Sequence, residues 1–418
     1  MRIKLGIITL LVAVTLGGCD NEPNVEPADL IFSSGAVFTS DPEQPTASAV
    51  AIRGKRIVYV GEEAGITPFV GADTRRIDIG DGLLISGLMD SHTHVFNGSF
   101  SDVGVNLSLA DTREKLQTAL EAIRDANPGS GPVYARGWQN HLFPKTGPTA
   151  LQLDDIFGDR IVILGSVDGH SRWFSSRALK EGGVNANYPD PQPGVSFFER
   201  DPLTNEPLGT GRERAGGHIA ATFIPGDRSA YQERFVRWLP RAAAAGLTGV
   251  YDAWAAAPSE QEAYEIWHSL SESGDLSIRV FGSVREIDSA DLIANQFKSF
   301  ERNFTSEMVR PEAIKLAADG VPEGHTAFLL TPYVDSSNED FGNPMISKAD
   351  MTANITTYFG ADIPVHIHAI GGAAVRMSLD AIEAARTATG NESVRATIAH
   401  MDFVHPDDIP RFKALNVT

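Results

Sequence analysis

The chain has 418 residues, 42% hydrophobic and 21% charged, which is typical of a globular protein of one large domain or two to three smaller ones. Its formal net charge of −19 disfavours binding to nucleic acid or to anionic lipid surfaces, and we attribute the acidity to solubility. Cys19 is the only cysteine, which excludes an intramolecular disulfide.

Residues 1–19 have the pattern of a secretory signal peptide. Arg2 and Lys4 precede an apolar stretch, 5–16, that is too short for a membrane-spanning helix. The sequence LGGC ending at Cys19 resembles a bacterial lipoprotein cleavage box, so we expect Cys19 to carry lipid; an uncleaved anchor or an incidental cysteine is the alternative. Residues 20–28 read as a flexible tether. This predicts a protein lipid-anchored in the bacterial cell envelope, on the periplasmic or extracellular side.

Residues 29–82 predict a small β-sandwich lobe. Runs such as DLIFSSGAVFTSD and ASAVAIRGKRIVYVG show β-branched alternation that Gly, Asp and Pro interrupt. We expect the sequence RGKR, at 53–56, to turn a hairpin.

From residue 83 to 418, apolar strand-like runs alternate with helical stretches such as 259–273 and 373–389. This alternation predicts a parallel sheet that is buried on both faces, either open or closed into a barrel. Residues from about 97 to 240 interrupt the pattern, and we interpret them as a long insertion that forms a subdomain over one end of the sheet. The runs are LLISGLMDSHTH, LTGVYDAW, SIRVFGSV, AIKLAADG, IPVHIHAIGG and RATIAHMDFV.

The first of these runs ends in two histidines one residue apart. Because side chains alternate along a strand, Asp90, His92 and His94 would share a face. Two imidazoles and a carboxylate suit a divalent metal, whereas a solvated polar strand end is the alternative.

Two later runs also bring histidines to their ends. His366 and His368 share parity, and His368 is the better ligand candidate because it lies nearer the end of the strand. His366 is either a ligand or a hydrogen-bonded core histidine. His400 closes a buried strand, where a core histidine is again the alternative. The carboxyl ends of barrel strands build the active site in α/β barrels.

Lys315 lies in the apolar run AIKLAADG, and a buried lysine is costly unless it is paired. A salt bridge to Asp319 or Asp252 is one solution. The other is carboxylation of the amine by CO2, which gives an anionic carbamate able to bridge two metal ions. Burial favours this chemistry because it lowers the pKa of the lysine and frees the amine.

Taken together, GLMDSHTH, AIKLAADG, PVHIHAIGG and IAHMDFVHPDDIPRF resemble the amidohydrolase superfamily. They resemble more narrowly its family-3 branch, which includes N-substituted formamide deformylase-like proteins, as do RGWQNHLFP, VDGHSRWFSSRAL and GLTGVYDA. The resemblance implies an α/β fold: a (β/α)8 TIM-type barrel, of which strands 1–6 are present, with the long insertion after strand 1. It also implies that residues 29–82 are the N-terminal part of a β-sandwich lobe.

The resemblance further implies one or two divalent metal ions, usually zinc. His92 and His94 on strand 1 would bind the more buried ion, and Lys315 on strand 4 would be the carboxylated bridge. His368 and His400, on strands 5 and 6, would bind the second ion.

Four further residues are candidates for substrate binding. The resemblance places Trp138, His170 and Glu213, all in the insertion, around the substrate, with a packing role as the alternative for Trp138. His325 stands where the family commonly has an arginine, a departure that bears on which substrates fit. The strand-8 aspartate that would take a proton from the attacking water is expected beyond residue 418. We therefore assign no catalytic residue and expect the sequence to be a fragment of a longer reading frame.

The function expected is hydrolysis of an amide-type C–N bond of a small molecule by a metal-activated hydroxide. A lactone, carbamate or phosphotriester hydrolase of the same fold is one alternative, and a non-catalytic lipoprotein that binds a small molecule is another. We expect no nucleic-acid partner and membrane contact only through the lipid at Cys19, and the sequence is compatible with a homo-oligomer.

Overall fold

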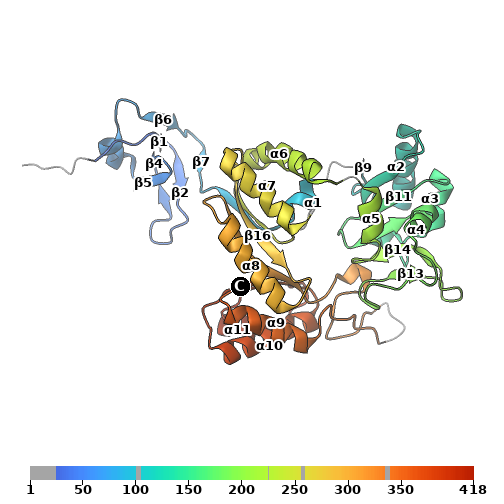
Figure 1. Ribbon diagram of the computed structural model, residues 1–418. Helices are drawn as coiled ribbons and strands as arrows, with labels where there is room; N and C mark the ends of the chain where they lie inside the picture. The colour runs from blue at the N-terminus through green and yellow to red at the C-terminus, as the bar shows by residue number, and fades with distance from the viewer. Residues whose placement is uncertain (1–24, 100–104, 225, 256–258, 335–338) are drawn as a thin grey trace, which may run out of the picture. The chain divides into compact units, whose positions relative to one another are not determined.

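The structure of the protein is a computed structural model, drawn in Figure 1. It describes residues 25–99, 105–224, 226–255, 259–334 and 339–418. The signal peptide and the lipidation site expected at Cys19 lie outside the described residues. The chain divides into two compact units, with the boundary between Gly87 and Leu88. Within the described ranges, no helix has both the length and the apolar composition that crossing a membrane requires.

The N-terminal unit consists of two small sheets with apolar side chains between and beside them. Strand β4 has buried residues on both faces, as the alternation of its side chains requires. Ala49 and Ala51 pack with Ile66, whereas Val50 packs with Val37 of the other sheet. The larger sheet has the order β5 (Arg56–Gly61), β4 (Ala49–Arg53), β1 (Leu30–Ser33), β6 (Arg75–Asp78), and the smaller one β3 (Thr46–Ala47), β2 (Ala36–Phe38), β7 (Leu83–Leu84).

The hairpin expected at 53–56 joins β4 and β5. Arg53 and Arg56 are paired across the turn, and Gly54 has a positive φ of 55°, which glycine adopts without steric cost. A short 3-10 helix, η1 (Glu63–Phe69), follows β5 and covers one face of the larger sheet with Ile66. The β lobe expected from the sequence is therefore confirmed.

The second unit contains a six-stranded parallel sheet whose strands follow chain order. Each strand pairs in parallel with the next. This is the order of strands 1–6 of a (β/α)8 barrel, as the sequence predicts. After the sixth strand, Val417 pairs in parallel with Ala396, so the last residues continue the same order. The strands are β8 (Leu88–Thr93), β15 (Leu247–Asp252), β16 (Arg279–Arg285), β17 (Val309–Ala317), β18 (Val365–Ala369) and β19 (Ala396–His400).

Amphipathic helices between these strands form the second layer (Figure 1). In α8, the buried residues Ile293, Phe297 and Phe300 recur at intervals of three or four, which gives one apolar face toward the sheet. The helices expected at 259–273 and 373–389 are α7 and α10. The helices are α1 (Val95–Ser99), α6 (Arg228–Ala244), α7 (Glu260–Ser273), α8 (Ala290–Phe304), α9 (Lys348–Gly360), α10 (Gly372–Thr389) and α11 (Ile409–Ala414).

The insertion after β8 has its own mixed sheet and two cores. Leu164 of β11 packs with Leu120 on one face, whereas Ile163 packs with Leu179 and Ile219 on the other. Its strands, in spatial order, are β13 (Phe198–Arg200), β14 (Pro207–Arg212), β12 (Ser171–Phe174), β11 (Val162–Ser166), β10 (Val133–Trp138) and β9 (Val105–Asn106). Its helices are α2 (Arg113–Ala126), α3 (Ala150–Phe157), α4 (Ser176–Glu181) and α5 (Gly217–Phe223).

The insertion ends earlier than the sequence predicts. Helix α6 lies inside the expected range of about 97 to 240, but its Phe235 and Leu239 pack into the core of the parallel sheet. The elements that build the separate sheet therefore end with α5. The amphipathic pattern of α6 fits both locations, and only the tertiary packing distinguishes them.

Candidate metal centre

Five side chains singled out in the sequence line one cavity of about 730 Å³. They come from four different strands, and they meet because the carboxyl ends of parallel strands lie at the same edge of the sheet. They are His92 and His94 at and just beyond the end of β8, Lys315 in β17, His368 in β18 and His400 at the end of β19.

The histidines form one continuous cluster. The ring centroid of His92 lies 5.5 Å from that of His94 and 4.8 Å from that of His400. The His400 ring in turn lies 4.5 Å from that of His368. The alternation expected for His92 and His94 therefore places both rings in the same cluster.

Each imidazole of the cluster is held in its neutral form. Burial, followed by the positive charge of Lys315, lowers the pKa of His92 to about 3 and the pKa of His94 to about 4. Burial also lowers the pKa of His400 to about 4 and brings that of His368 well below its usual value. Neutral imidazole is the form that binds a metal ion.

The amine of Lys315 is buried in an unusual state. The residue is 3% exposed, and among the described residues its Nζ has no hydrogen-bond partner. Burial lowers the pKa of Lys315 to about 7. Among the described residues, Lys315 forms neither of the salt bridges considered from the sequence. Asp319 accepts hydrogen bonds from the backbone amides of Phe328, Ile370 and Gly371, and within the same part of the chain Oδ2 of Asp252 has no hydrogen-bond partner.

These residues fit a divalent metal ion by the chemistry of their unsatisfied atoms. Nε2 of His92 and Nζ of Lys315 are both buried without a hydrogen-bond partner, and buried polar atoms are normally paired. Across the described ranges, no three His, Cys, Asp or Glu side chains already converge on one point. The imidazoles would therefore turn about their side-chain bonds to share an ion, with Lys315 as the additional donor.

Of the two alternatives for His366, the structure supports the hydrogen-bonded core histidine. Its Nε2 lies 2.9 Å from Nδ1 of His92, and its ring stacks on Tyr251 with centroids 4.7 Å apart. Burial and nearby positive charge lower the pKa of His366 to about 2.

Asp90 is solvent-exposed, and its carboxylate accepts a hydrogen bond from the backbone amide of His92.

His170 and Glu213 reach the same cavity from the insertion. Nδ1 of His170 lies 2.7 Å from Oε2 of Glu213, and Oε1 of Glu213 accepts a hydrogen bond from Thr326 at 2.7 Å. Burial alone would lower the pKa of His170, but the hydrogen bond and charge of Glu213 outweigh it and raise the pKa. The His170 ring lies 5.9 Å from that of His368.

The run AIKLAADG ends in Gly320, where the structure leaves no room for a side chain. A Cβ atom at this position would collide with Oε1 of Glu213 and Oγ1 of Thr326. The absence of a side chain at Gly320 therefore lets the carboxylate of the insertion approach the loop after β17 closely.

The backbone has positive φ at three positions beside the cavity, two at the end of β19 and one in the insertion. His400 and Met401 have φ values of 79° and 56°, and Glu213 has 51°. Residues with a Cβ rarely adopt positive φ, and they do so mostly where the surrounding structure enforces it, as at functional sites.

The sequence over the whole second unit matches a known protein family. A protein-family model described as the amidohydrolase family (family 3) matches residues 75–418. The chain belongs to the amidohydrolase family.

Curated relatives of this amidohydrolase have diverse names. Over 398 residues it is 27% identical to the exoenzymes regulatory protein AepA of Pectobacterium carotovorum subsp. carotovorum, covering 93% of this chain and 83% of that protein. Over 381 residues it is 25% identical to the N-substituted formamide deformylase of Arthrobacter pascens, covering 88% of this chain and 68% of that protein.

Solved structures show the same fold. A crystal structure of an uncharacterised metal-dependent hydrolase from Pyrococcus horikoshii OT3 superposes with a TM-score of 0.67 at 21% identity. It covers 93% of this chain and 73% of that one. The counterpart from Pyrococcus furiosus gives a TM-score of 0.65 at 22% identity.

Two of the substrate-binding candidates lie elsewhere in this amidohydrolase. Trp138 is fully buried in a core of the insertion, where its indole N–H donates to the carbonyl of Leu164, so the structure supports the packing role. His325 is not among the residues that line the cavity; its ring stacks on Tyr333 at 4.2 Å, and its Nδ1 lies 3.4 Å from Asp340.

Sequence reasoning missed the arginines of the cavity. Arg172, Arg214 and Arg285 line it together with Trp254. Arg285 could have been found, because it is the last residue of β16 at the edge where the histidines gather. Arg172 and Arg214 lie in the insertion, and no local pattern connects them to the parallel sheet.

Proposed function

We propose that this amidohydrolase is a metal-dependent hydrolase that cleaves an amide-type C–N bond of a small molecule. The observation that carries the proposal is the cluster of neutral imidazoles around an unpaired Lys315 at one edge of the parallel sheet. Family membership supports hydrolysis. The amide class is supported by the relative named N-substituted formamide deformylase.

The ligand set proposed for one or two divalent ions is His92, His94, Lys315, His368 and His400. Zinc suits neutral imidazole donors. When bound, such an ion polarises the carbonyl under attack and lowers the pKa of water to near 7.

Lys315 is proposed to be carboxylated. Its lowered pKa leaves much of the amine unprotonated at neutral pH, so the lone pair can attack the carbon of CO2. The new N–C bond gives a carbamate, and the amine releases one proton to solvent. The product is an anion, which removes the cost of a buried unpaired amine once its oxygens hold a cation.

His170 is proposed to orient the substrate. The hydrogen bond to Glu213 fixes the imidazole so that its other nitrogen is available on the side of the cavity. Glu213 is itself fixed by Thr326, so the donor is held by a chain of two hydrogen bonds. A substrate carbonyl or leaving nitrogen placed in the cavity could accept or donate a hydrogen bond there.

The experiment combines metal analysis with hydrolysis. The protein, expressed from its whole reading frame, is purified and loaded with zinc, its metal content is measured, and release of formate from N-formyl amines is followed before and after chelation. We expect metal to be bound and activity to disappear with chelator and return with zinc. His94→Asn and His400→Asn should each lose at least tenfold in metal affinity, whereas His141→Asn, an exposed histidine of the insertion, should change neither metal content nor rate. A chain that holds no more metal than a zinc-free control protein, or hydrolysis that is indifferent to chelation, would contradict the proposal.

Carboxylation of Lys315 is tested by a separate measurement, 13C nuclear magnetic resonance. After exchange with 13C-bicarbonate, we expect a carbamate carbon signal that Lys315→Met lacks. A spectrum identical in the two proteins would exclude the carbamate at Lys315.

The envelope location is proposed from the N-terminal residues. The support for lipidation of Cys19 is the sequence LGGC that ends at this residue. Metabolic labelling with a palmitate analogue in a bacterial host should mark the full chain and not Cys19→Ala. Equal labelling of both proteins, or of neither, would contradict it.

A further inference from the structure

One wall of the cavity contains two guanidinium groups around a single indole. The guanidinium carbon of Arg285 lies 5.2 Å from the ring centroid of Trp254, and that of Arg214 lies 5.9 Å from the same centroid. Arg285 comes from the end of β16, and Arg214 from the insertion, just after β14. Two strands that are far apart in sequence thus bring like charges to one aromatic ring.

The two guanidinium groups differ in their partners among the described residues. Nε of Arg285 lies 3.1 Å from Oε1 of Glu260, which is buried. Within the described part of the chain, the side chain of Arg214 has no hydrogen bond and no salt bridge; its contact is with Trp254. Burial and the charge of Arg285 lower the pKa of Arg214, and the nearby charge of Glu213 only partly offsets them.

The carboxylates of the cavity are engaged elsewhere. Glu213 is bound to His170 and Thr326, and Asp319 accepts three backbone amides. Asp168 accepts hydrogen bonds from Asn140 and from the backbone amide of His170. None of them satisfies the guanidinium of Arg214, although the chain as a whole carries a net charge of −19.

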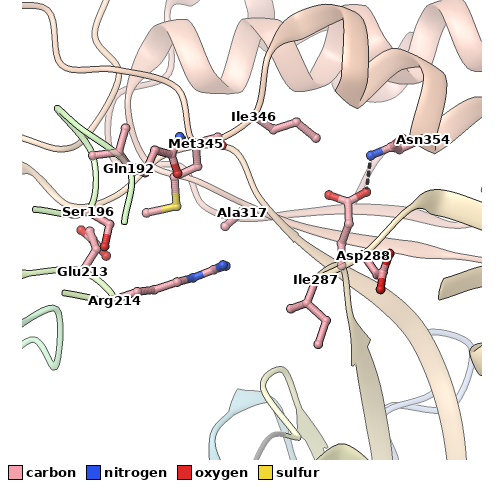
Figure 2. A pocket seen from close by; sticks show the side chains of 12 residues that line it. Gln192, Ser196, Glu213, Arg214, Ile287, Asp288, Ala317, Met345, Ile346 and Asn354 are labelled. Atoms are coloured by element: carbon pink, nitrogen blue, oxygen red, sulfur yellow. Dashed lines mark hydrogen bonds between the residues drawn. The ribbon is translucent and has the colours of Figure 1, made fainter. Parts of the chain in front are cut away.

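Arg214 also lines a second cavity of about 350 Å³ that adjoins the first. Figure 2 shows its side chain extended into this space, with the guanidinium directed away from Glu213. Glu286, in the same cavity, accepts hydrogen bonds from Asn354 and Tyr358 and does not pair with Arg214. Arg214 is thus accessible to a molecule in either cavity.

We propose that Arg214, with Arg285 beside it and Trp254 beneath, binds a carboxylate of the substrate, so that the enzyme acts on anionic N-acyl compounds. The proposal rests on the proposed function and adds the substrate class. A planar guanidinium binds a carboxylate through two parallel hydrogen bonds. A carboxylate matches this place in the cavity because the guanidinium of Arg285 is already paired with Glu260, whereas that of Arg214 forms no ion pair among the described residues. The indole, with Ile287 and Met345, gives an apolar surface for the carbon skeleton next to the anion.

The first test measures binding without catalysis. Calorimetry on the full chain compares 3-phenylpropionate with the neutral 3-phenylpropanamide. We expect the acid to bind at least tenfold more tightly than the amide. Arg214→Gln should remove this preference, a loss of about 10- to 100-fold in affinity for the acid, the usual range for charge-assisted hydrogen bonds.

Arg279→Gln is the matched control. Arg279 is exposed and lies at the opposite end of β16 from Arg285. The substitution Arg279→Gln therefore removes one positive charge without changing a residue of the cavity. Its affinity for the acid should equal that of the unaltered chain. Equal binding of acid and amide, or an equal loss in Arg279→Gln and Arg214→Gln, would overturn the assignment of the anion site to Arg214.

The second test separates the anion site from the hydrolase activity. N-formylphenylalanine and N-formylphenethylamine differ by the carboxylate alone, and both are offered to the zinc-loaded chain. We expect at least tenfold higher kcat/KM for the acid, lost through KM in Arg214→Gln. Hydrolysis of both compounds at equal rates would overturn the anion site and leave the hydrolase proposal intact. Tight binding of 3-phenylpropionate without hydrolysis of any formamide would contradict the hydrolase proposal and leave the anion site intact.

Discussion

Nδ1 of His170 lies 2.7 Å from Oε2 of Glu213, and this contact within the insertion fixes an imidazole whose ring lies 5.9 Å from that of His368. The other oxygen of the same carboxylate binds Thr326, in the loop after β17. One buried carboxylate therefore fixes an imidazole of the insertion and a loop of the parallel sheet at once. This carboxylate thus holds one side of the cavity, because it fixes His170 and Thr326 together.

Glu213→Gln should reduce catalysis more than substrate binding. The amide keeps the size of the side chain but loses the charge, so the imidazole of His170 is held less firmly. We expect kcat for an N-formyl substrate to fall about 10- to 100-fold with a KM within about threefold of the original, consistent with loss of a positioned hydrogen bond. Glu206→Gln, on the exposed turn before β14, is the control and should match the unaltered chain. A rise in KM at constant kcat would show instead that Glu213 acts in binding alone.

Trp138→Phe should affect stability and leave substrate affinity unchanged. The indole is fully buried against Phe143 and Trp173, and its N–H donates to Leu164. Phenylalanine removes that hydrogen bond and leaves a small void, which should cost about 1–3 kcal/mol of unfolding free energy. Urea unfolding gives the stability and KM reports the substrate contact. A changed KM at unchanged stability would restore Trp138 to the substrate-binding residues.

The strand order and the histidine cluster could be predicted from the sequence because both follow from local pattern. Apolar runs that alternate with amphipathic helices allow few architectures, and parallel strands necessarily bring their carboxyl ends to one edge. His92, His94, His368 and His400 stand at those ends, so their gathering needs no knowledge of the loops.

The partners of each side chain could not be predicted in the same way. Asp319 lies four residues after Lys315, which suggests a salt bridge, but the chain turns after β17 and its carboxylate binds amides of two later loops. Arg214 meets Trp254 only because the insertion folds against the parallel sheet. Both contacts depend on tertiary packing, which no local sequence pattern encodes.

Asp380→Asn should destabilise the fold at neutral pH and matter less in acid. Asp380 binds Lys348 and Arg411, each at 2.7 Å, and joins α9, α10 and α11. Burial would raise the pKa of Asp380, but these hydrogen bonds and charges outweigh it and lower the pKa below its usual value of 3.8. A carboxyl with a lowered folded pKa stabilises the fold above the unfolded pKa, and the contribution is lost as the pH falls through the folded pKa.

The measurement is urea unfolding of both proteins at several pH values. We expect a difference of about 0.5–1 kcal/mol at pH 7, as for partly exposed ion pairs, that shrinks steadily below about pH 4. Asp155→Asn, an exposed residue of α3 that forms no ion pair in the described structure, should show no difference at any pH. A gap between the Asp380 proteins that persists unchanged at pH 2.5 would show that the aspartate acts by packing and not by charge.

Lys315→Met should abolish activity without lowering the stability of the metal-free chain. The amine is buried and unpaired, so a side chain of similar length and no charge removes a desolvation cost of about 1–3 kcal/mol. We expect the urea midpoint of the metal-free protein to stay or rise, and zinc content and formamide hydrolysis to fall at least tenfold. Lys298→Met, at a half-buried lysine of α8 that pairs with Glu301, is the control and should alter neither metal content nor rate. A large drop in metal-free stability in Lys315→Met would mean that the amine is paired in solution, and the argument for Lys315 as a metal-bridging residue would fail with it.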